Sequence, residues 1–213
     1  MSSRPNHRPF LIVVSSPSGA GKTTVCRQVV KRDPGVAYSV SATTRPRRRG
    51  ETHGHSYLFY SEGEFRRKLA QGGLLEHARV YDHSYGTPRQ PVLDHFRAGR
   101  DVIADLDIQG MRSCKRTLPG TVAVFIVAPS RDELARRLHG RGTDALEVVA
   151  RRQAELDAEL AAIPEFDYLV INDRLEKAVQ DVMAIVRAER RRTSRMMPAS
   201  PVRRSGPKKE IKT

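Results

Sequence analysis

Ser16-Pro17-Ser18-Gly19-Ala20-Gly21-Lys22-Thr23 is the stretch of this sequence that decides its fold. An apolar run at residues 10–14 precedes it and predicts a strand, and residues 22–32 predict a helix. A loop of small residues between the two lets backbone N–H groups surround a phosphate, because glycine has no Cβ to block the approach. The helix directs the positive end of its dipole at the same anion. We therefore predict a phosphate-binding loop.

The loop follows the general pattern GxxxxGK(S/T), in which Lys reaches the β- and γ-phosphates and the hydroxyl residue binds Mg²⁺. Lys22 and Thr23 take these places, while Ser16 stands where the pattern begins with Gly. The loop predicts a nucleoside triphosphate donor, but it does not name the acceptor. The expected ATP-binding residues of this segment are Ser16, Pro17, Ser18, Gly19, Ala20, Gly21, Lys22, Thr23 and Thr24.

Strand-like and helix-like segments alternate along most of the 213 residues. Such alternation predicts an α/β fold whose mostly parallel sheet is covered by helices on both faces. Further strands are expected at residues 38–41, 74–81, 101–107, 122–128 and 168–171. Further helices are expected at residues 62–69, 92–98, 131–140, 144–162 and 175–186, with another around Cys114.

Two helices begin with the pattern of a capping box, in which a Ser and the Glu three residues later satisfy each other's backbone N–H groups. The pairs are Ser61 with Glu64 and Ser130 with Glu133. An apolar stripe at helical spacing marks the face that the last helix buries. The stripe consists of Leu175, Ala178, Val179, Val182, Ile185 and Val186.

The net charge of +14 does not by itself predict nucleic-acid binding, because half of it lies near the chain ends. Residues 193–213 carry +5 and residues 1–9 carry +2, which leaves +7 on the body. A site for two phosphorylated ligands gathers cations, and this excess suits one. We expect residues 1–8 and 193–213 to be disordered basic tails, the latter dispensable for catalysis. Nucleic-acid binding by the basic tail stays open and has no support in the sequence.

Composition and cysteine usage favour a cytoplasmic protein with no membrane association. Apolar residues make up 38% and charged residues 29%, as in globular chains. The apolar run at residues 122–128 is far shorter than the roughly 18 residues of a membrane span. Cys26 and Cys114 both lie in predicted helices, which argues for a reducing compartment and against a disulfide framework. Whether the chain forms a homo-oligomer is left undecided by the sequence.

The most specific pattern is TTRPRRRGETHGHSYLF at residues 43–59. It has two hydroxyl residues and an arginine, then a basic residue, an acidic residue, a glycine and aromatics at fixed spacing. Taken alone, the arginines are equally typical of a solvated basic loop or a nucleic-acid patch. Joined to the phosphate loop, the pattern resembles the guanylate kinase family of the bacterial type. The resemblance covers roughly residues 9–192.

In that family this segment binds the monophosphate of GMP. Guanidinium and hydroxyl groups suit a dianionic phosphate, because charge-assisted hydrogen bonds are strong. The phosphate-binding residues that the resemblance implies are Ser41, Arg45, Arg48, Tyr57 and Tyr85.

LEHA at residues 75–78 and SYGT at residues 84–87 resemble the family's guanine pocket. Guanine presents its N1–H and its N2 amine side by side, and one carboxylate accepts hydrogen bonds from both. The resemblance gives this role to Glu76 and implies that Thr87 also bonds the base.

Asp105 and Asp107 end the predicted strand at residues 101–107, where ligands bind in open α/β sheets. Because they are two residues apart, both side chains should point the same way. The resemblance includes both in the GMP-binding set, between donor and acceptor. It also implies that Asp105 or Asp107 acts, through water, on the Mg²⁺ that Thr23 ligates.

The remaining implied residues surround the transferred phosphate and the adenine base. Arg137, Arg141 and Arg152 resemble lid arginines, and with Lys22 and Arg45 they form the implied catalytic set. A well-placed arginine accelerates GTPases by about 10³–10⁵. Asn172 resembles the residue that contacts adenine, and it is equally typical of an N-cap of the last helix.

The resemblance implies a three-layer P-loop nucleoside monophosphate kinase fold over residues 9–192. The core would comprise residues 9–41, 88–134 and 164–192, with a GMP-binding insertion at 42–87 and a helical lid at 135–163. The implied activity is an ATP:GMP phosphotransferase of purine nucleotide metabolism that makes GDP and ADP, with Mg²⁺ as cofactor.

Two alternatives stay open. A related P-loop kinase could use another phosphorylated acceptor, against which Glu76 and Thr87 argue. A guanylate-kinase-like binding module could lack catalysis, against which the intact Lys22 and Thr23 argue.

Overall fold

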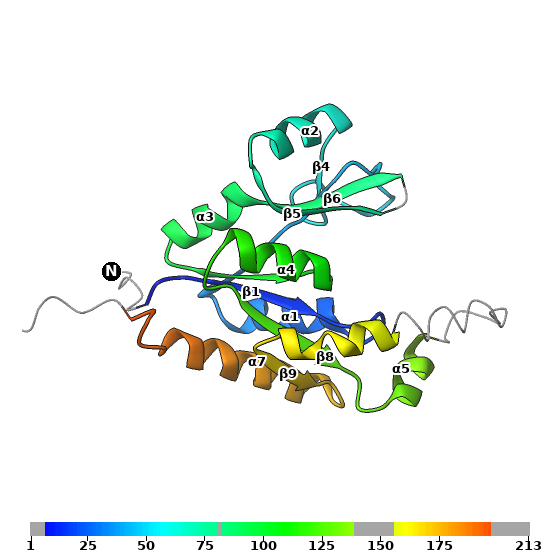
Figure 1. Cartoon of the computed structure of the whole chain (residues 1–213), viewed down its shortest axis with the longest axis vertical. Coiled ribbons are helices and arrows are strands. Elements are labelled where there is room, and N and C mark those ends of the chain that lie inside the picture. Colours follow the sequence, from blue (N-terminus) through cyan, green and yellow to red (C-terminus); the bar gives the residue numbers. More distant parts are fainter. Residues whose placement is uncertain (1–6, 81, 139–155, 197–213) are drawn as a thin grey trace, which may run out of the picture.

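The computed structural model describes residues 7–80, 82–138 and 156–196 of the chain. At its centre is a five-stranded sheet of order β2-β7-β1-β8-β9, in which every neighbouring pair is parallel. Helices lie on both faces of this sheet (Figure 1), so the predicted three-layer α/β class is confirmed. The strands are β1 (Leu11–Ser15), β2 (Val36–Tyr38), β7 (Asp101–Asp105), β8 (Val122–Val127) and β9 (Tyr168–Ile171).

The helices around this sheet are α1 (Lys22–Arg32), α3 (Arg89–Arg97), α4 (Ile108–Thr117), α5 (Arg131–Leu138) and α7 (Leu175–Arg190). Residues 156–161 are also helical, and a short 3₁₀ turn, η1, spans Ile163–Glu165. Alternate residues of β1 face opposite sides, because successive side chains of a strand do so. Ile12 and Val14 pack in the cluster that contains α1 and α7, whereas Leu11 and Val13 pack with α3 and α4.

A second sheet of order β4-β3-β6-β5 stands beside the core (Figure 1). Phe65 of α2 (Glu62–Ala70) packs against Ala42 and Leu74 of this sheet. The capping box predicted at Ser61 is present in full. The strands are β3 (Ala42–Thr43), β4 (Leu58–Phe59), β5 (Leu74–Val80) and β6 (His83–Pro88), and they occupy the segment for which we predicted the insertion.

The predicted strand at residues 101–107 is two residues too long. β7 ends at Asp105, and Asp107 is the N-cap of α4, where its side chain accepts a hydrogen bond from the Gly110 N–H at 2.7 Å. The prediction that Asp105 and Asp107 point the same way on one strand is therefore wrong, because a cap residue has already turned toward its helix. The strand predicted at residues 38–41 likewise lies earlier, at Val36–Tyr38.

The last helix begins at Leu175, as predicted, but its buried stripe begins only at Ala178. Its N-cap is Arg174, so the prediction of Asn172 as N-cap is wrong. Leu175 is 40% exposed and does not belong to the buried stripe. The fully buried members are Ala178, Val179, Val182 and Val186.

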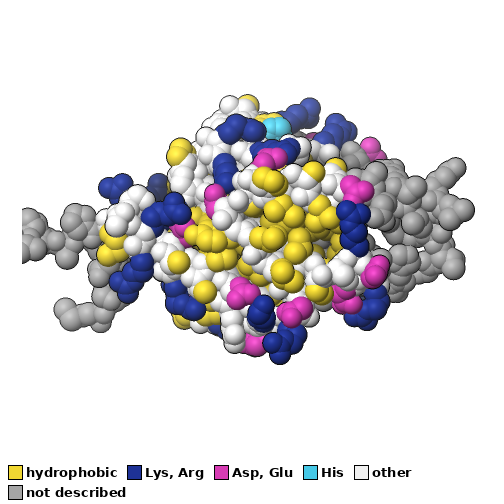
Figure 2. All heavy atoms as spheres, turned by 60° about the horizontal axis from the view of Figure 1, so that its bottom comes forward, with side chains coloured by type: hydrophobic (Ala, Val, Ile, Leu, Met, Phe, Trp, Pro, Cys, Tyr) yellow, Lys and Arg dark blue, Asp and Glu magenta, His cyan; other side chains and the backbone are white. Residues whose placement is uncertain are grey.

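The edge of the central sheet exposes apolar side chains. Leu169 and Ile171 of β9 are exposed, while Val170 between them is buried. Figure 2 views the molecule with the bottom of Figure 1 turned forward, and apolar side chains gather on the face that it shows. Among the described helices, none is both long and apolar enough to cross a membrane.

The beginning of the C-terminal tail is packed against the core. The guanidinium of Arg195 lies 4.2 Å from the ring centroid of Phe10 and donates hydrogen bonds to Gly120 O at 2.8 Å and to buried Glu189 at 3.1 Å. The Arg8 N–H donates to Arg195 O. The prediction of disordered tails is therefore wrong for residues 7–8 and 193–196; residues 1–6 and 197–213 lie outside the described residues.

We expect Arg195→Ala to lower the free energy of unfolding by about 2 kcal/mol, because it removes a charged hydrogen bond to a buried carboxylate. Arg192 and the Tyr168 hydroxyl still bond Glu189, which limits the loss. For a chain of this size the thermal midpoint should fall by about 4–8 °C. Arg191→Ala removes an exposed arginine from the same segment and should change the midpoint little. Equal midpoints for Arg195→Ala and wild type would contradict the packing role.

Candidate functional site

A cleft of about 510 Å³ lies between the phosphate-loop end of the core and the small sheet. It lies at the carboxyl ends of β2 and β7, the expected place for a ligand in a parallel sheet. The predicted site residues that line it are Lys22, Thr23, Ser41, Tyr57 and Asp105. Its other lining residues are Arg27, Tyr38, Ser39, Glu51 and Ser56.

The phosphate loop connects β1 to α1 as the sequence predicts. Gly19 and Gly21 have φ angles of 81° and 90°, in the left-handed region that favours glycine. The Lys22 ammonium reaches across the loop and donates a hydrogen bond to Leu106 O at 3.3 Å. Thr23 and Thr24 are exposed at the start of α1. Lys22 and Thr23 thus bring an ammonium and a hydroxyl together at the wall of the cleft.

Asn172, which follows β9, holds this loop from behind. Its buried side-chain amide donates a hydrogen bond to Ala20 O at 2.8 Å. A Cβ on Gly21 would lie only 2.7 Å from Asn172 Nδ2, so Gly21 is required both for its φ angle and for this close approach. The contact gives Asn172 a role in fixing the loop that the sequence did not predict; its contact with adenine stays a prediction.

Asp105, the last residue of β7, accepts hydrogen bonds from two hydroxyl groups. Thr23 Oγ1 donates to Oδ2 at 2.5 Å, and the Tyr38 hydroxyl donates to Oδ1 at 2.5 Å. Both distances fall in the range of strong bonds between a hydroxyl and a carboxylate. The two bonds therefore fix the orientation of the Asp105 carboxylate through both of its oxygens.

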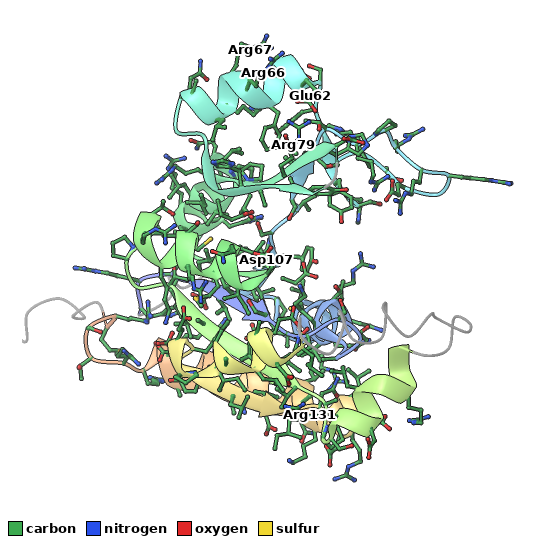
Figure 3. The ribbon with its side chains drawn as sticks, turned by 45° about the vertical axis from the view of Figure 1, so that its right-hand side comes forward. Glu62, Arg66, Arg67, Arg79, Asp107 and Arg131 are labelled. Atoms are coloured by element: carbon green, nitrogen blue, oxygen red, sulfur yellow. The ribbon has the colours of Figure 1, made fainter. Side chains whose placement is uncertain are left out.

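Asp107 lies at the start of α4, between the core and the small sheet (Figure 3). Glu62, Arg66 and Arg67 of α2 lie at the outer end of the small sheet in the same view. The charges of α2 therefore belong to a solvated helix face, whereas Asp107 lies at the junction of the two sheets.

Arg45 is held by an ion pair in the small sheet. Its guanidinium donates to Glu51 at 2.6 and 3.1 Å, and Glu51 also accepts from the Arg48 N–H at 2.7 Å. The bond with Arg45 is the main cause that lowers the pKa of Glu51. The guanidinium carbon lies 5.5 Å from the ring centroid of Tyr57 and 5.9 Å from that of Phe59. Arg45 is thus oriented before any anion binds.

Tyr57 and Tyr85 meet edge to face, with their ring centroids 6.1 Å apart. Tyr85 lies in β6 opposite Thr43, which brings the two predicted phosphate-binding segments together. The Arg48 side chain is exposed, so of this segment's arginines the structure orients Arg45 and leaves Arg48 in solvent.

Glu76 of β5 is 8% exposed and accepts a hydrogen bond from Thr87 Oγ1 at 2.7 Å. Burial raises the pKa of Glu76 to about 7, with a further contribution from the charge of Asp107, while the Thr87 bond opposes the shift. A Cβ on Gly110 would lie 3.5 Å from Glu76 Cγ, so the first turn of α4 closes one side of this pocket. The structure therefore pairs Glu76 with Thr87, as the sequence resemblance implies.

Arg141 and Arg152 of the predicted lid lie outside the described residues, and the side chain of Arg137 does so as well. Ser130 caps α5, as predicted, by accepting a hydrogen bond from the Glu133 N–H at 3.1 Å. Arg131 pairs with Asp157 at 2.7 Å, far from the junction at which Asp107 lies (Figure 3).

The sequence of this chain is similar to those of known proteins. The sequence profile of the family described as "Guanylate kinase" matches residues 8–189. The chain belongs to the guanylate kinase family. A guanylate kinase of Carboxydothermus hydrogenoformans is 44% identical over 190 residues, which cover 89% of this chain and 93% of the relative. One of Alkalilimnicola ehrlichii is 46% identical over 188 residues, which cover 88% and 93%.

A solved structure extends the similarity from sequence to fold. The crystal structure of guanylate kinase from Anaplasma phagocytophilum superposes on this chain with a TM-score of 0.72. It is 29% identical in sequence, and the match covers 92% of this chain and 93% of that one. The three-layer architecture and the added small sheet are thus those of a guanylate kinase family member.

Sequence reasoning missed Glu51 and Tyr38 as residues of the site. Glu51 lies inside the family signature segment. It could have been found as the acidic residue that follows several arginines, because one of these arginines pairs with it. Tyr38 is the one residue of Val36–Tyr38 whose side chain carries a polar group. Its hydroxyl at the end of an otherwise apolar strand could have indicated a role in the site.

We expect Glu76→Gln to stabilise the protein at about pH 8 and to change it little at or below about pH 4.5. The folded state keeps the Glu76 proton up to a pKa of about 7, against an ordinary value of 4.5. The stability that protonated Glu76 contributes is therefore fully present below the pKa of Glu76 in the unfolded chain. It is lost as the pH rises through the pKa of Glu76 in the folded protein. The loss in wild type is about 3 kcal/mol at roughly 1.4 kcal/mol per pKa unit, and glutamine avoids it.

Thermal midpoints of wild type and Glu76→Gln across this pH range measure the effect. Exposed Glu62→Gln is the matched control and should follow wild type. Parallel pH profiles for wild type and Glu76→Gln would show that the pKa of Glu76 is not raised.

Proposed function

We propose that this chain transfers the γ-phosphoryl group of ATP to GMP, making ADP and GDP. The observation that carries the proposal is one cleft lined by Lys22 and Thr23 of the phosphate loop and by Tyr57 of the signature segment. Glu51, which pairs with Arg45, lines the same cleft, and the Tyr85 ring contacts that of Tyr57. The guanylate kinases at 44% and 46% identity support this choice of substrates, since the matches extend over nearly all of each chain.

The phosphate loop is proposed to hold the triphosphate of ATP. Its N–H groups and the start of α1 favour an anion, and Lys22 is free to exchange its bond to Leu106 O for phosphate oxygens. Asn172 keeps the loop in shape through Ala20 O. Ser16, Pro17, Ser18, Gly19, Ala20, Gly21, Lys22, Thr23, Thr24 and Asn172 are proposed as the ATP-binding set.

The acceptor phosphate is proposed to bind Arg45, Arg48, Ser41, Tyr57 and Tyr85. The ion pair with Glu51 orients the fork of Arg45, and a dianionic phosphate can then compete for its N–H donors. The exposed Arg48 side chain can turn toward the same anion, since no hydrogen bond or ion pair with another described residue holds its guanidinium.

The guanine base is proposed to bind the carboxylate of Glu76 and the hydroxyl of Thr87. An ionised Glu76 accepts from both N1–H and N2–H, whereas adenine offers no such pair of donors at that place. Asp107 lies close enough to raise the pKa of Glu76, and we propose that it completes the base pocket with Asp105.

Mg²⁺ is the proposed cofactor, and the residues present suit it. Mg²⁺ typically takes one or two protein oxygens and completes its shell with water and substrate phosphates. The Thr23 hydroxyl and the Asp105 carboxylate, 2.5 Å apart, offer such a partial set. When bound, the ion neutralises charge that develops on the phosphates during transfer. No cluster of three or more His, Cys, Asp or Glu occurs in the described parts of the chain, so a fully protein-bound metal is not what these residues offer.

Catalysis in this proposal is positioning and charge stabilisation. The core orients the donor and the small sheet orients the acceptor. Lys22 lines the cleft between them, as does Glu51, the ion-pair partner of Arg45. Arg137, Arg141 and Arg152 are proposed, from the family resemblance, to supply further positive charge. The free, buried Cys26 and Cys114 support a reducing compartment such as the cytoplasm.

We expect Lys22→Met to reduce turnover by at least about 10²-fold, because the ammonium stabilises charge on the moving phosphoryl group. GMP binding should persist, since other residues make it. Release of ADP from ATP, measured with and without GMP, tests the first point, and calorimetry with GMP tests the second.

Lys31→Met removes an exposed lysine from the same helix and should keep wild-type turnover. Near-normal turnover of Lys22→Met would overturn the phosphate-loop assignment and favour a binding module.

A further inference from the structure

We propose that Tyr38 is a positioning residue for phosphoryl transfer: its hydroxyl holds the carboxylate of Asp105 in the orientation that the divalent cation of the donor nucleotide requires. This inference rests on the proposed function. Neither the signature segment at residues 43–59 nor the phosphate loop includes Tyr38.

The strand order explains why Tyr38 reaches Asp105. β2 lies next to β7 in parallel, with Tyr38 opposite Ile103. Both strands end at the same edge of the sheet, Tyr38 as the last residue of β2 and Asp105 as the last of β7. A phenol is long enough to span the remaining two residues, and it does so with a hydroxyl-to-Oδ1 distance of 2.5 Å.

The two hydroxyl groups that bond Asp105 differ in whether they remain available to it when a cation binds. A carboxylate turns easily about its last torsion, which has broad minima, so its orientation depends on its partners. Thr23 bonds Oδ2 in this structure, but the Thr23 oxygen is the proposed cation ligand. Tyr38 is the other hydrogen-bond donor to Asp105 among the described residues, and it bonds Oδ1. Tyr38 can therefore keep Asp105 oriented while Thr23 serves the cation.

The Tyr38 hydroxyl is the donor in its bond to Asp105, because a carboxylate oxygen accepts.

The ring of Tyr38 has a separate packing role. It lines both the cleft and a neighbouring cavity of about 200 Å³, whose wall includes Leu58, Val92 and His95. Phenylalanine keeps this ring and removes only the hydroxyl. Tyr38→Phe therefore separates the orientation of Asp105 from the packing of the wall.

The test compares binding of ATP with Mg²⁺ and with EDTA, by calorimetry on full-length wild type and Tyr38→Phe. Loss of a residue that orients a metal-binding group typically weakens metal affinity or activity about 10–100-fold. We expect Mg²⁺–ATP to bind at least about tenfold more weakly to Tyr38→Phe, and ATP with EDTA to bind within about twofold of wild type. In steady-state kinetics kcat should fall, with KM for GMP unchanged.

Two matched Tyr→Phe variants complete the design. Tyr57→Phe should raise KM for GMP and leave the Mg²⁺ dependence of ATP binding as in wild type. Tyr60→Phe removes a hydroxyl outside the cleft lining and should match wild type in both measurements. In a double-mutant cycle, Tyr38→Phe should add no loss of Mg²⁺–ATP affinity to Asp105→Asn, because both act through one carboxylate.

Wild-type Mg²⁺ dependence of ATP binding in a folded Tyr38→Phe would overturn the proposal, and so would equal losses with Mg²⁺ and with EDTA. Additive losses in the double-mutant cycle would also overturn it. Failure of wild type to phosphorylate GMP would instead overturn the proposed function, because the calorimetry with ATP does not depend on the acceptor.

Discussion

The parallel order of β2, β7 and β1 is the constraint on which the site depends. Parallel strands end at one edge, so Tyr38, Asp105 and the phosphate loop lie together although they are far apart in sequence. The strands are apolar on each side, and helices cover both faces, as is typical of a parallel sheet. The hydroxyl bonds at Asp105 are therefore a consequence of sheet packing as much as of local sequence.

The small sheet adds a second site whose groups are arranged at some cost to stability. Glu76 lies buried beside Thr87, and its raised pKa shows that burial disfavours its charged form. A guanine that donates two hydrogen bonds would remove this penalty. Arg45 is the opposite case, since Glu51 neutralises its charge. The small sheet thus contains one buried carboxylate whose charge is poorly compensated and one guanidinium whose charge is well compensated.

The sequence predicted the fold class and many elements because their signals are local. The helix at Lys22–Arg32 and the strand at Tyr168–Ile171 have the predicted bounds, and the capping box at Ser61 is complete. The end of β7 was missed because Asp107 continues the pattern of a strand while its side chain caps α4.

Contacts between distant segments could not be predicted in the same way. Asn172 was expected to contact adenine or to cap a helix. Its side-chain amide instead donates a hydrogen bond to Ala20 O, 152 residues earlier in the sequence. Arg195 was assigned to a disordered tail because the tail is rich in Pro, Ser, Lys and Arg and lacks an apolar stripe. The contact of Arg195 with the Phe10 ring forms only in the folded core.

The measurement that tests the account most directly is kcat/KM for GMP and for AMP, with ATP as donor, on wild type and Glu76→Gln. Wild type should strongly prefer GMP, because a buried carboxylate selects a base with two adjacent donors. In Glu76→Gln, KM for GMP should rise at least about tenfold and the preference for GMP should narrow, since an amide opposes one guanine donor with an N–H group. An unchanged GMP-to-AMP ratio would contradict the account, because the structure would then hold its acceptor by groups other than Glu76.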